Sequence, residues 1–271
     1  MKKYLCPCKS GTFREVIFLK SKPKGETDFL IPEEKYSRRY LKCSVCGHFV
    51  SELEFDISSI YSKDYVTSTY GSIEGMKKKF DFIMNLPDDE SDNRSRVKRI
   101  NNQIGKSVGD ENRNLLDFGA GLGVFPVLMK EYGWNPFAIE PDKRTICHLT
   151  NVGIKNVFLS IEEVRSEFLG KFDLISINKV LEHIDKPNDL ILKLLPFLSA
   201  SGVFYIEVPD AESAFKYDDP KEREEFFIEH IHGFTTSSLA LLMSGVGLNI
   251  IKIESIREPS GKYTLFAFGK I

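Results

Sequence analysis

The sequence of 271 residues lacks any apolar stretch long enough to cross a bilayer. Its first residues, "MKKYLCPCKSG", are basic but lack an apolar core, so they do not form a secretory signal peptide. Neither charge is in excess, since 37 Lys and Arg stand against 39 Asp and Glu. This balance provides no general attraction to nucleic acid or to an anionic membrane. We therefore expect a cytoplasmic globular protein that has no membrane partner and no general affinity for nucleic acid.

Cysteine is also scarce, with five residues in the whole chain. Cys6, Cys8, Cys43 and Cys46 lie near the N-terminus, and Cys147 stands alone far downstream. In a reducing compartment such thiols are metal ligands or buried groups and not disulfides. The second pair has the Cys-x2-Cys-Gly pattern of a zinc knuckle, and the first pair is one residue shorter. The pattern predicts a structural Zn²⁺ on these four cysteines.

The residues around the cysteines predict a small β-module over residues 1–56. "FREVIFLK" and "RRYLK" alternate like strands, as in the hairpins of a zinc ribbon. His48, beside the second pair, is a candidate to replace one cysteine as a ligand. The alternative is two pairs of reduced thiols beneath a small sheet. A module of this size usually needs a staple to stay folded, which favours the metal.

A helical connector or lid is expected over residues 57–109. Its helices are predicted at 72–85 and 94–107, on either side of the acidic loop "LPDDESDN". The basic side chains of these helices form either a solvated face or a site for a phosphate-bearing ligand. They are Lys77, Lys78, Lys79, Arg94, Arg96, Lys98 and Arg99.

Strands and helices alternate from residue 114 onward, which predicts an α/β fold with a doubly wound parallel sheet over residues 110–271. Pro126 is tolerated only in the first turn of a helix, and Gly133 is expected just past that helix's end. Asp142 and Gly153 bound the next helix in the same way. Ligands of such sheets bind beyond the carboxyl ends of the strands.

A glycine-rich segment, "DFGAGLG", closes the first of these strands. Gly119 and Gly121 allow a ligand to approach the backbone closely, and the following helix offers free amides. Asp117 disfavours a pyrophosphate there and favours a cation, such as the ammonium or sulfonium of S-adenosylmethionine. Glu140 closes the second strand, where a carboxylate suits the two hydroxyls of a ribose. The alternative is that the loop is only a tight turn.

With these residues the chain resembles the class I S-adenosylmethionine-dependent methyltransferases. The resemblance rests on six segments in order, "LLDFGAGLG", "AIEPD", "LSIEEV", "FDLISINKVLEHI", "GVFYIEVP" and "EHIHGFTTSSLALLMSGVGL". It implies S-adenosylmethionine as cofactor and a Rossmann-like, seven-stranded sheet. A final hairpin from "LNIIKIESI" and "KYTLFAFGK" would complete this sheet, with its last strand antiparallel.

The cofactor-binding residues that the resemblance implies lie just beyond the parallel strands. They are Asp117, Gly119, Ala120 and Gly121 at the methionine end, Glu140 at the ribose, Ser160, Ile161 and Glu162 at the adenine, and Asn178 beside the methionine. "KVLEHI" then supplies a Glu-His pair, Glu182 and His183. His183 either faces the cleft as a candidate catalytic residue, or the pair anchors the loop.

The segment "EEFFIEHIHGFTTSSL" holds Glu229, His230 and His232 close together. A metal site is one interpretation, but hydroxyl residues stand where a further carboxylate ligand is expected. A structural interpretation has Glu229 and His230 capping a helix that begins near Thr236, with Phe234 packed inward. The catalytic interpretation makes His230 the base that deprotonates the methyl acceptor, oriented by Glu229.

The cysteine module and this late segment together make the chain similar to bacterial sugar methyltransferases, in particular the nucleotide-sugar C-methyltransferases. The resemblance implies that a carbon acidified by a neighbouring ketone is deprotonated at a Glu-His pair, which Glu229 and His230 match. Phe227 stands where this family has a tyrosine, so carbon, oxygen and nitrogen all stay open as acceptor atoms. The expected partner is a small, carbohydrate-derived acceptor.

Two other classes of function stay open. A zinc ribbon on a methyltransferase domain also suits an enzyme that docks RNA or protein, although the sequence has neither an extended basic, aromatic-studded face nor an "NPPY" tetrapeptide. A non-catalytic module that binds S-adenosylmethionine is the other class. The intact Asp117, glycine loop and Glu140 argue against it.

Overall fold

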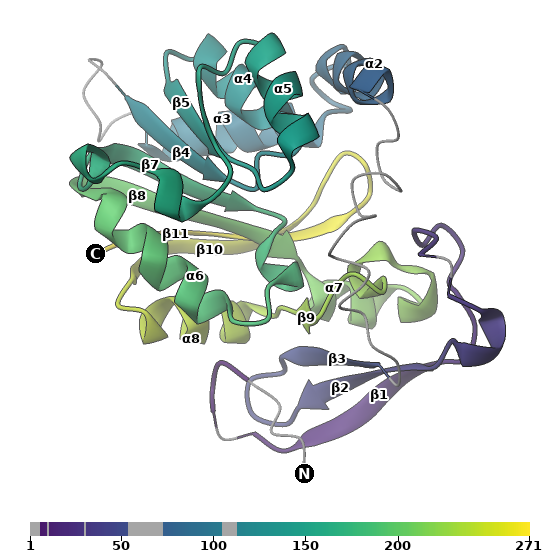
Figure 1. Ribbon diagram of the computed structural model, residues 1–271. Helices are drawn as coiled ribbons and strands as arrows, with labels where there is room; N and C mark the ends of the chain where they lie inside the picture. The colour runs from purple at the N-terminus through teal and green to yellow at the C-terminus, as the bar shows by residue number, and fades with distance from the viewer. Residues whose placement is uncertain (1–5, 10, 30, 54–72, 105–112) are drawn as a thin grey trace.

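The computed structural model describes residues 6–9, 11–29, 31–53, 73–104 and 113–271, which form a large and a small β-sheet (Figure 1). No helix in these described ranges is long and apolar enough to cross a membrane. Short 3-10 helices join the main elements. They are η1 (Glu33–Lys35), η3 (Ile161–Glu163), η4 (Ser166–Phe168), η5 (Leu181–His183), η6 (Leu195–Phe197), η7 (Pro220–Glu222) and η8 (Glu224–Phe226).

The large sheet has seven strands in the order β10-β11-β8-β7-β4-β5-β6. These are β4 (Asn114–Phe118), β5 (Asn135–Ile139), β6 (Asn156–Phe158), β7 (Phe172–Asn178), β8 (Leu198–Pro209), β10 (Asn249–Arg257) and β11 (Tyr263–Lys270). Strands β4 to β8 run parallel, and β11 is antiparallel to both of its neighbours. The prediction of a seven-stranded sheet completed by an antiparallel last strand is confirmed.

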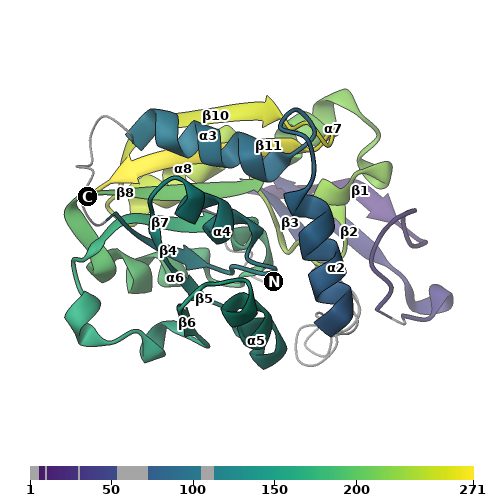
Figure 2. The same cartoon turned by 90° about the horizontal axis from the view of Figure 1, so that it is seen from above.

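Helices cover both faces of the large sheet, as expected where the central strands are apolar on both sides (Figures 1 and 2). One face carries α2 (Ile73–Met84), α3 (Asp92–Ile104), α4 (Val124–Glu131) and α5 (Lys143–Asn151). The other carries α6 (Pro187–Leu194) and α8 (Thr236–Gly245). The connector helices α2 and α3 therefore share a hydrophobic core with β4, β8 and β11.

The helix ends follow the local signals in the sequence. Asp142 caps α5 by accepting a hydrogen bond from the Arg144 backbone N–H, and Gly153 follows that helix with φ 94°. Gly133 similarly follows α4 with φ 83°. Asp142 thus begins α5 just beyond the carboxyl end of β5, on the edge where the site lies, whereas Gly133 and Gly153 end their helices shortly before the next strands begin.

The small sheet has four strands in the order β1-β2-β3-β9. Strands β1 (Phe13–Leu19), β2 (Arg38–Cys43) and β3 (Phe49–Leu53) form an antiparallel meander. The fourth strand, β9 (His232–Gly233), comes from the late segment of the chain and pairs with β3. A core of Tyr40, Phe49, Phe226 and Ile228 joins this sheet to α7 (Ala211–Tyr217) and η8. The N-terminal strands are thus built directly onto the segment that holds His230.

Candidate active site

A cavity of about 980 Å³ opens at the carboxyl ends of β4, β7 and β8. Five parts of the chain line it: the turn around Gly25 in the small module, the start of α3, the loops that directly follow the parallel strands, the late segment that includes His230, and the start of β11. Gly119, Gly121 and Glu140 lie at one end, and His183 and His230 lie at the other. We refer to these as the cofactor end and the acceptor end.

Asp117 is the second-last residue of β4, just before the glycine loop, and is buried. Its carboxylate accepts hydrogen bonds from Ser176 Oγ (2.6 Å) and Asn178 Nδ2 (2.9 Å). Burial raises the pKa of Asp117 from 3.8 to about 6, and these two donors offset only part of that rise. A bound cation would remove the cost of keeping this carboxylate ionised.

Glu140 follows β5 and is also buried. Its Oε2 accepts a hydrogen bond from the Gly121 backbone N–H (2.9 Å), which ties the second strand to the glycine loop. Burial raises the pKa of Glu140, and the backbone donors of Gly121 and Asp142 lower it by less. Gly119 has φ 77°, and a Cβ there would lie 2.5 Å from Val180 Cγ2, so this position requires glycine.

The remaining predicted cofactor residues do not all reach the cavity. Asn178 lines it, and its Oδ1 is buried with no hydrogen-bond partner among the described residues. Ala120 packs beside the core under α5, and Ser160 and Ile161 begin η3 without lining the cavity. Pro141, the residue after Glu140, lines the cavity on that side instead.

Lys179, which the sequence analysis did not single out, follows Asn178 in a left-handed conformation, φ 54°. A non-glycine residue in this region is strained, and such strain is concentrated at functional sites. Its ammonium donates to Thr264 Oγ1 (2.7 Å), and burial lowers its pKa. In the sequence, the position of Lys179 directly after the fourth parallel strand was the feature that could have indicated a functional residue.

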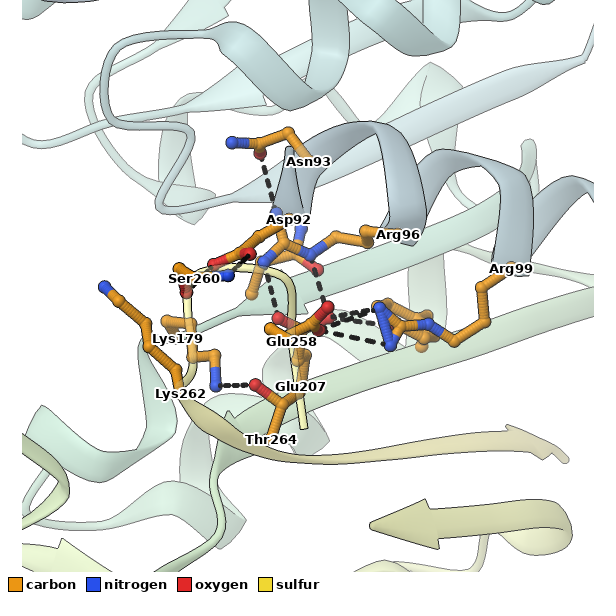
Figure 3. Close-up of polar contacts among 12 residues, drawn as sticks. Asp92, Asn93, Arg96, Arg99, Lys179, Glu207, Glu258, Ser260, Lys262 and Thr264 are labelled. Carbon is orange, nitrogen blue, oxygen red and sulfur yellow. Dashed lines mark hydrogen bonds and ion pairs between the residues drawn. The ribbon is translucent and has the colours of Figure 1, made fainter. Parts of the chain in front are cut away.

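A buried ion-pair cluster joins α3 to the large sheet, and its Arg96 lines the cavity (Figure 3). Arg96 Nε and Nη2 donate to the two carboxylate oxygens of Glu207 at 2.8 and 2.5 Å. Arg99 donates to Glu258 at 3.0 Å and lies 3.8 Å from Glu207. The expectation of a solvated or phosphate-binding face is therefore wrong for Arg96 and Arg99, because both are committed to carboxylates of the sheet. Lys77, Lys78 and Lys79 are exposed on α2.

The acceptor end brings together His183 and His230 with Glu182 and Glu229, all of which line the cavity. His183 Nδ1 contacts the backbone oxygen of Glu229 (2.7 Å), and His230 Nδ1 contacts that of Glu225 (3.0 Å). The two imidazole rings lie 4.9 Å apart between centroids. The backbone carbonyl that orients His230 thus belongs to Glu225, whereas the sequence analysis assigned its orientation to Glu229. Burial lowers the pKa of both imidazoles, so both are neutral at pH 7.

Side chains of the small module hold the backbone around His230 in place. The Tyr40 hydroxyl contacts the carbonyl oxygens of His230 (2.9 Å) and Phe227 (3.1 Å). Arg38 donates to the Phe226 carbonyl, and Glu26 Oε1 accepts the Ile228 N–H (2.7 Å). These contacts join residues almost 200 positions apart in the sequence. The acceptor end is therefore built from both ends of the chain.

His232 and His48 form a buried pair behind the acceptor end. Their ring nitrogens lie 3.0 Å apart, and the other ring nitrogen of His48 lies 3.2 Å from Ser238 Oγ. The sequence made His48 a candidate to replace one of the four cysteines as a ligand. In the structure both of its ring nitrogens face other side chains, so it does not take that place. The cap of α8 is Thr235 with Ser238, and not Glu229 and His230. Phe234 packs inward, fully buried, as the structural interpretation expected.

The four N-terminal cysteines converge at one end of the small sheet. Their sulfur atoms all lie within 4.8 Å of one another, and the Cys6–Cys46 distance is 3.0 Å. That separation exceeds a disulfide bond, and all four are free thiols. The Val45 backbone N–H points to Cys43 Sγ (3.4 Å), as in a metal knuckle. The cluster is large enough for one tetrahedral ion with bonds of about 2.3 Å.

Residues 90–253, more than half of the chain, match a protein family described as a methyltransferase domain. The chain belongs to this methyltransferase family. It is an S-adenosylmethionine-dependent methyltransferase, with the cavity at the strand ends as its candidate active site.

Curated and solved relatives of the methyltransferase are distant. It is 21% identical over 169 residues to the C-methyltransferase NovU of Streptomyces niveus, which covers 61% of this chain and 39% of that protein. The match thus spans about two fifths of the relative's length. The 1,6-didemethyltoxoflavin-N1-methyltransferase of Burkholderia thailandensis, solved with S-adenosylhomocysteine, superposes with a TM-score of 0.54 at 16% identity, covering 82% of this chain and 94% of that one.

Magnesium protoporphyrin IX methyltransferase from Synechocystis, also solved with bound S-adenosylhomocysteine, superposes with a TM-score of 0.57 at 11% identity. The superposition covers 78% of this methyltransferase and 99% of that chain. At such identities the likeness shows the shared fold.

Proposed function

We propose that this methyltransferase acts on a small, carbohydrate-derived acceptor, a sugar or a nucleotide-sugar. One observation carries the proposal: a single cavity connects Glu140 and Asn178, which holds the buried Asp117 behind it, with a pair of neutral imidazoles. The similarity to a C-methyltransferase and the fold shared with an enzyme named for a small-molecule acceptor support the choice of a small acceptor. The carbohydrate class rests on the sequence resemblance.

The cofactor end suits the polar groups of S-adenosylmethionine. Asp117 would hold its ammonium and Asn178 Oδ1 would accept from the same group, because Asn178 lines the cavity and lies within hydrogen-bond distance of the Asp117 carboxylate. Glu140 would accept from the ribose hydroxyls. Gly119 and Gly121 would lie against the methionine chain and Ala120 behind them. Ser160 and Ile161 are proposed for the adenine side, beyond Pro141.

The acceptor end would supply activation of the acceptor atom. The cofactor supplies a methyl group on a sulfonium; the acceptor's electron pair forms the new bond to this carbon as the carbon–sulfur bond breaks toward sulfur, leaving S-adenosylhomocysteine. His183 and His230 are proposed to assist the acceptor in losing its proton, with Glu229 beside them. Alignment at this end would contribute further, since positioned reactants react far faster than free ones.

We also propose that Cys6, Cys8, Cys43 and Cys46 bind a structural Zn²⁺. The converging sulfurs fit a tetrahedral ion, and Gly11 leaves room for them, since a Cβ there would lie 2.0 Å from Cys43 Sγ. With four thiolates the ion would have no open position, so it would crosslink the module and take no part in methyl transfer.

The test is a mass-spectrometric screen of nucleotide-sugars with the wild-type protein and with His230→Asn. Asparagine can keep a donor toward the Glu225 carbonyl while removing the outer ring nitrogen. A gain of one methyl in wild type, lost in the variant while calorimetry shows unchanged S-adenosylmethionine affinity, is expected. Methylation of RNA or protein but of no nucleotide-sugar would overturn the proposed acceptor class, and equal loss of cofactor binding would overturn the role of His230.

A further inference from the structure

Three side chains at the acceptor end converge as a set of metal ligands would. Glu182 and His183 lie on η5, His230 lies on the late segment, and one ligand atom from each falls within 4.8 Å of the others. All three line the cavity. His183 Nε2 lies 3.8 Å from Glu182 Oε1, too far for a hydrogen bond but compatible with two ligands of one ion.

The hydrogen bonds of both imidazoles fix the tautomer that a metal needs. Nδ1 of His183 and Nδ1 of His230 each face a backbone carbonyl oxygen, which can only accept a hydrogen bond. Each Nδ1 therefore carries the proton, and each Nε2 carries a lone pair. Metal-ligating histidines characteristically donate their second ring N–H to a carbonyl or carboxylate in this way.

Glu182 supplies an independent indication of a ligand. It is 1% exposed, and among the residues that the structure describes neither of its carboxylate oxygens has a hydrogen-bond partner. Burying a carboxylate without a partner is costly. Lys179 acts on it electrostatically, but the Lys179 ammonium donates a hydrogen bond to Thr264 Oγ1. A cation between Glu182 and the two imidazoles would satisfy the carboxylate.

We propose that Glu182, His183 and His230 bind one divalent first-row transition ion in the acceptor end of the cavity. Two imidazole nitrogens and one carboxylate oxygen form the two-histidine, one-carboxylate set that such ions occupy with positions left open. Mg²⁺ and Ca²⁺ prefer oxygen ligands and fit less well.

The inference rests on the proposed function and specifies how the acceptor end would activate its substrate. The open positions would accept an oxygen of the acceptor, and the charge of the ion would make that oxygen, or the carbon next to it, easier to deprotonate. With the ion bound, the two histidines would assist the loss of the acceptor's proton as ligands of the ion and not as bases, and the proton would leave to water. An acceptor with oxygens on neighbouring carbons, as sugars have, could occupy two positions of the ion.

Manganese binding to the full chain tests this site, because Mn²⁺ prefers oxygen and nitrogen ligands to the thiolates of the cysteine cluster. Protein is treated briefly with a weak chelator, metal analysis confirms that about one zinc per chain remains on the cysteine cluster, and Mn²⁺ is titrated with detection by electron paramagnetic resonance. We expect one bound Mn²⁺ per chain and a loss of affinity of at least about tenfold in both Glu182→Gln and His230→Asn. Glu224→Gln, which removes a carboxylate lining the same cavity outside the cluster, should bind as wild type.

Far-ultraviolet circular dichroism and S-adenosylmethionine affinity establish that each variant is folded. Absence of Mn²⁺ binding by the folded wild type, or equal affinity in wild type and Glu182→Gln, overturns the ion site. Nucleotide-sugar methylation that persists in such protein leaves the proposed function standing. Conversely, Mn²⁺ binding without methylation of any nucleotide-sugar removes the proposed acceptor class and leaves the ion site in place.

Discussion

Two buried carboxylates near the strand ends, Glu207 and Asp117, differ in whether a positively charged side chain is hydrogen-bonded to them. Burial alone would raise the pKa of Glu207, but the Arg96 guanidinium outweighs it and brings the value down to about 2. Burial raises the pKa of Asp117 to about 6, with hydrogen bonds from two neutral donors. Glu207 is therefore compensated inside the protein. Asp117 gains most from an external cation, which is why it is the residue assigned to the charged end of the cofactor.

Cofactor affinity should consequently depend on pH through Asp117. Above pH 6 the carboxylate is ionised and attracts the cationic cofactor; below pH 6 the proton occupies it first. We expect S-adenosylmethionine to bind about tenfold more weakly at pH 5 than at pH 7, because about one tenth of a group with pKa 6 is ionised at pH 5. Titration calorimetry across this range measures the effect.

Asp117→Asn is the matched variant for this pH dependence. It keeps the shape of the side chain and removes the titrating charge, so its affinity should be lower, by about 10- to 100-fold, and nearly flat between pH 5 and pH 7. A wild-type affinity that does not change over this range, or a variant that retains the wild-type profile, speaks against Asp117 as the cation partner.

The local sequence pattern identified Asp117 and Glu140 as site residues, but it did not reveal the buried partners of Arg96 and His232. Asp117 and Glu140 stand out because each ends an apolar strand, where a buried carboxylate has few uses besides binding. Arg96 lies in a helix rich in charged residues and looks solvated, since its partner Glu207 is 111 positions away. His232 is similar, because its partner His48 lies 184 positions earlier. Pairing over such distances has no signature in either local sequence.

At the scale of elements, β2 and β3 position the segment around His230. β3 pairs with β9, and the β2 residue Tyr40 reaches the carbonyls of Phe227 and His230. The strands and helices of the large sheet could be predicted from their apolar periodicity and caps. β9 could not, because a strand of two residues has no periodicity and exists only by pairing with β3.

Removing the Tyr40 hydroxyl should loosen the acceptor end without reaching the cofactor. Tyr40→Phe leaves two buried carbonyl oxygens short of a donor, so we expect a loss of about 1–3 kcal/mol in unfolding free energy. Turnover should fall about tenfold or more, because small displacements of reacting groups are costly, and cofactor affinity should be unchanged. Denaturant unfolding, steady-state kinetics and calorimetry measure the three quantities.

Tyr132→Phe is the control for this change, since it removes the same atom from an exposed tyrosine at the end of α4. It should match the wild type in all three measurements. Equal turnover in Tyr40→Phe and wild type would show that the hydroxyl does not position His230.

At the scale of the whole molecule, the two ends of the cavity depend on different parts of the chain. The residues that define the cofactor end, together with Asn178, lie at or just beyond the carboxyl ends of β4, β5 and β7 in the large sheet. The acceptor end needs the small sheet, whose cysteine cluster lies next to its contacts with the late segment. The Thr235 hydroxyl donates to the Cys46 carbonyl (2.8 Å), and His48 follows two residues later. Damage to the cluster should therefore affect the two ends unequally.

Cys46→Ser tests this separation without a chelator, which would also remove an ion from the acceptor end. We expect elemental analysis to show loss of the proposed zinc, since serine is a poor ligand for it. The freed knuckle should release the Thr235 cap and the strand pair β3–β9, so turnover should fall at least about tenfold. S-adenosylmethionine affinity should stay close to the wild-type value, because Asp117 and Glu140 contact none of these residues.

The control is Cys147→Ser, which changes an exposed cysteine on α5 and should leave metal content, turnover and affinity unchanged. Parallel loss of turnover and cofactor affinity in Cys46→Ser would mean that the small sheet supports the whole fold, whereas loss of turnover alone would identify it as the part that builds the acceptor end.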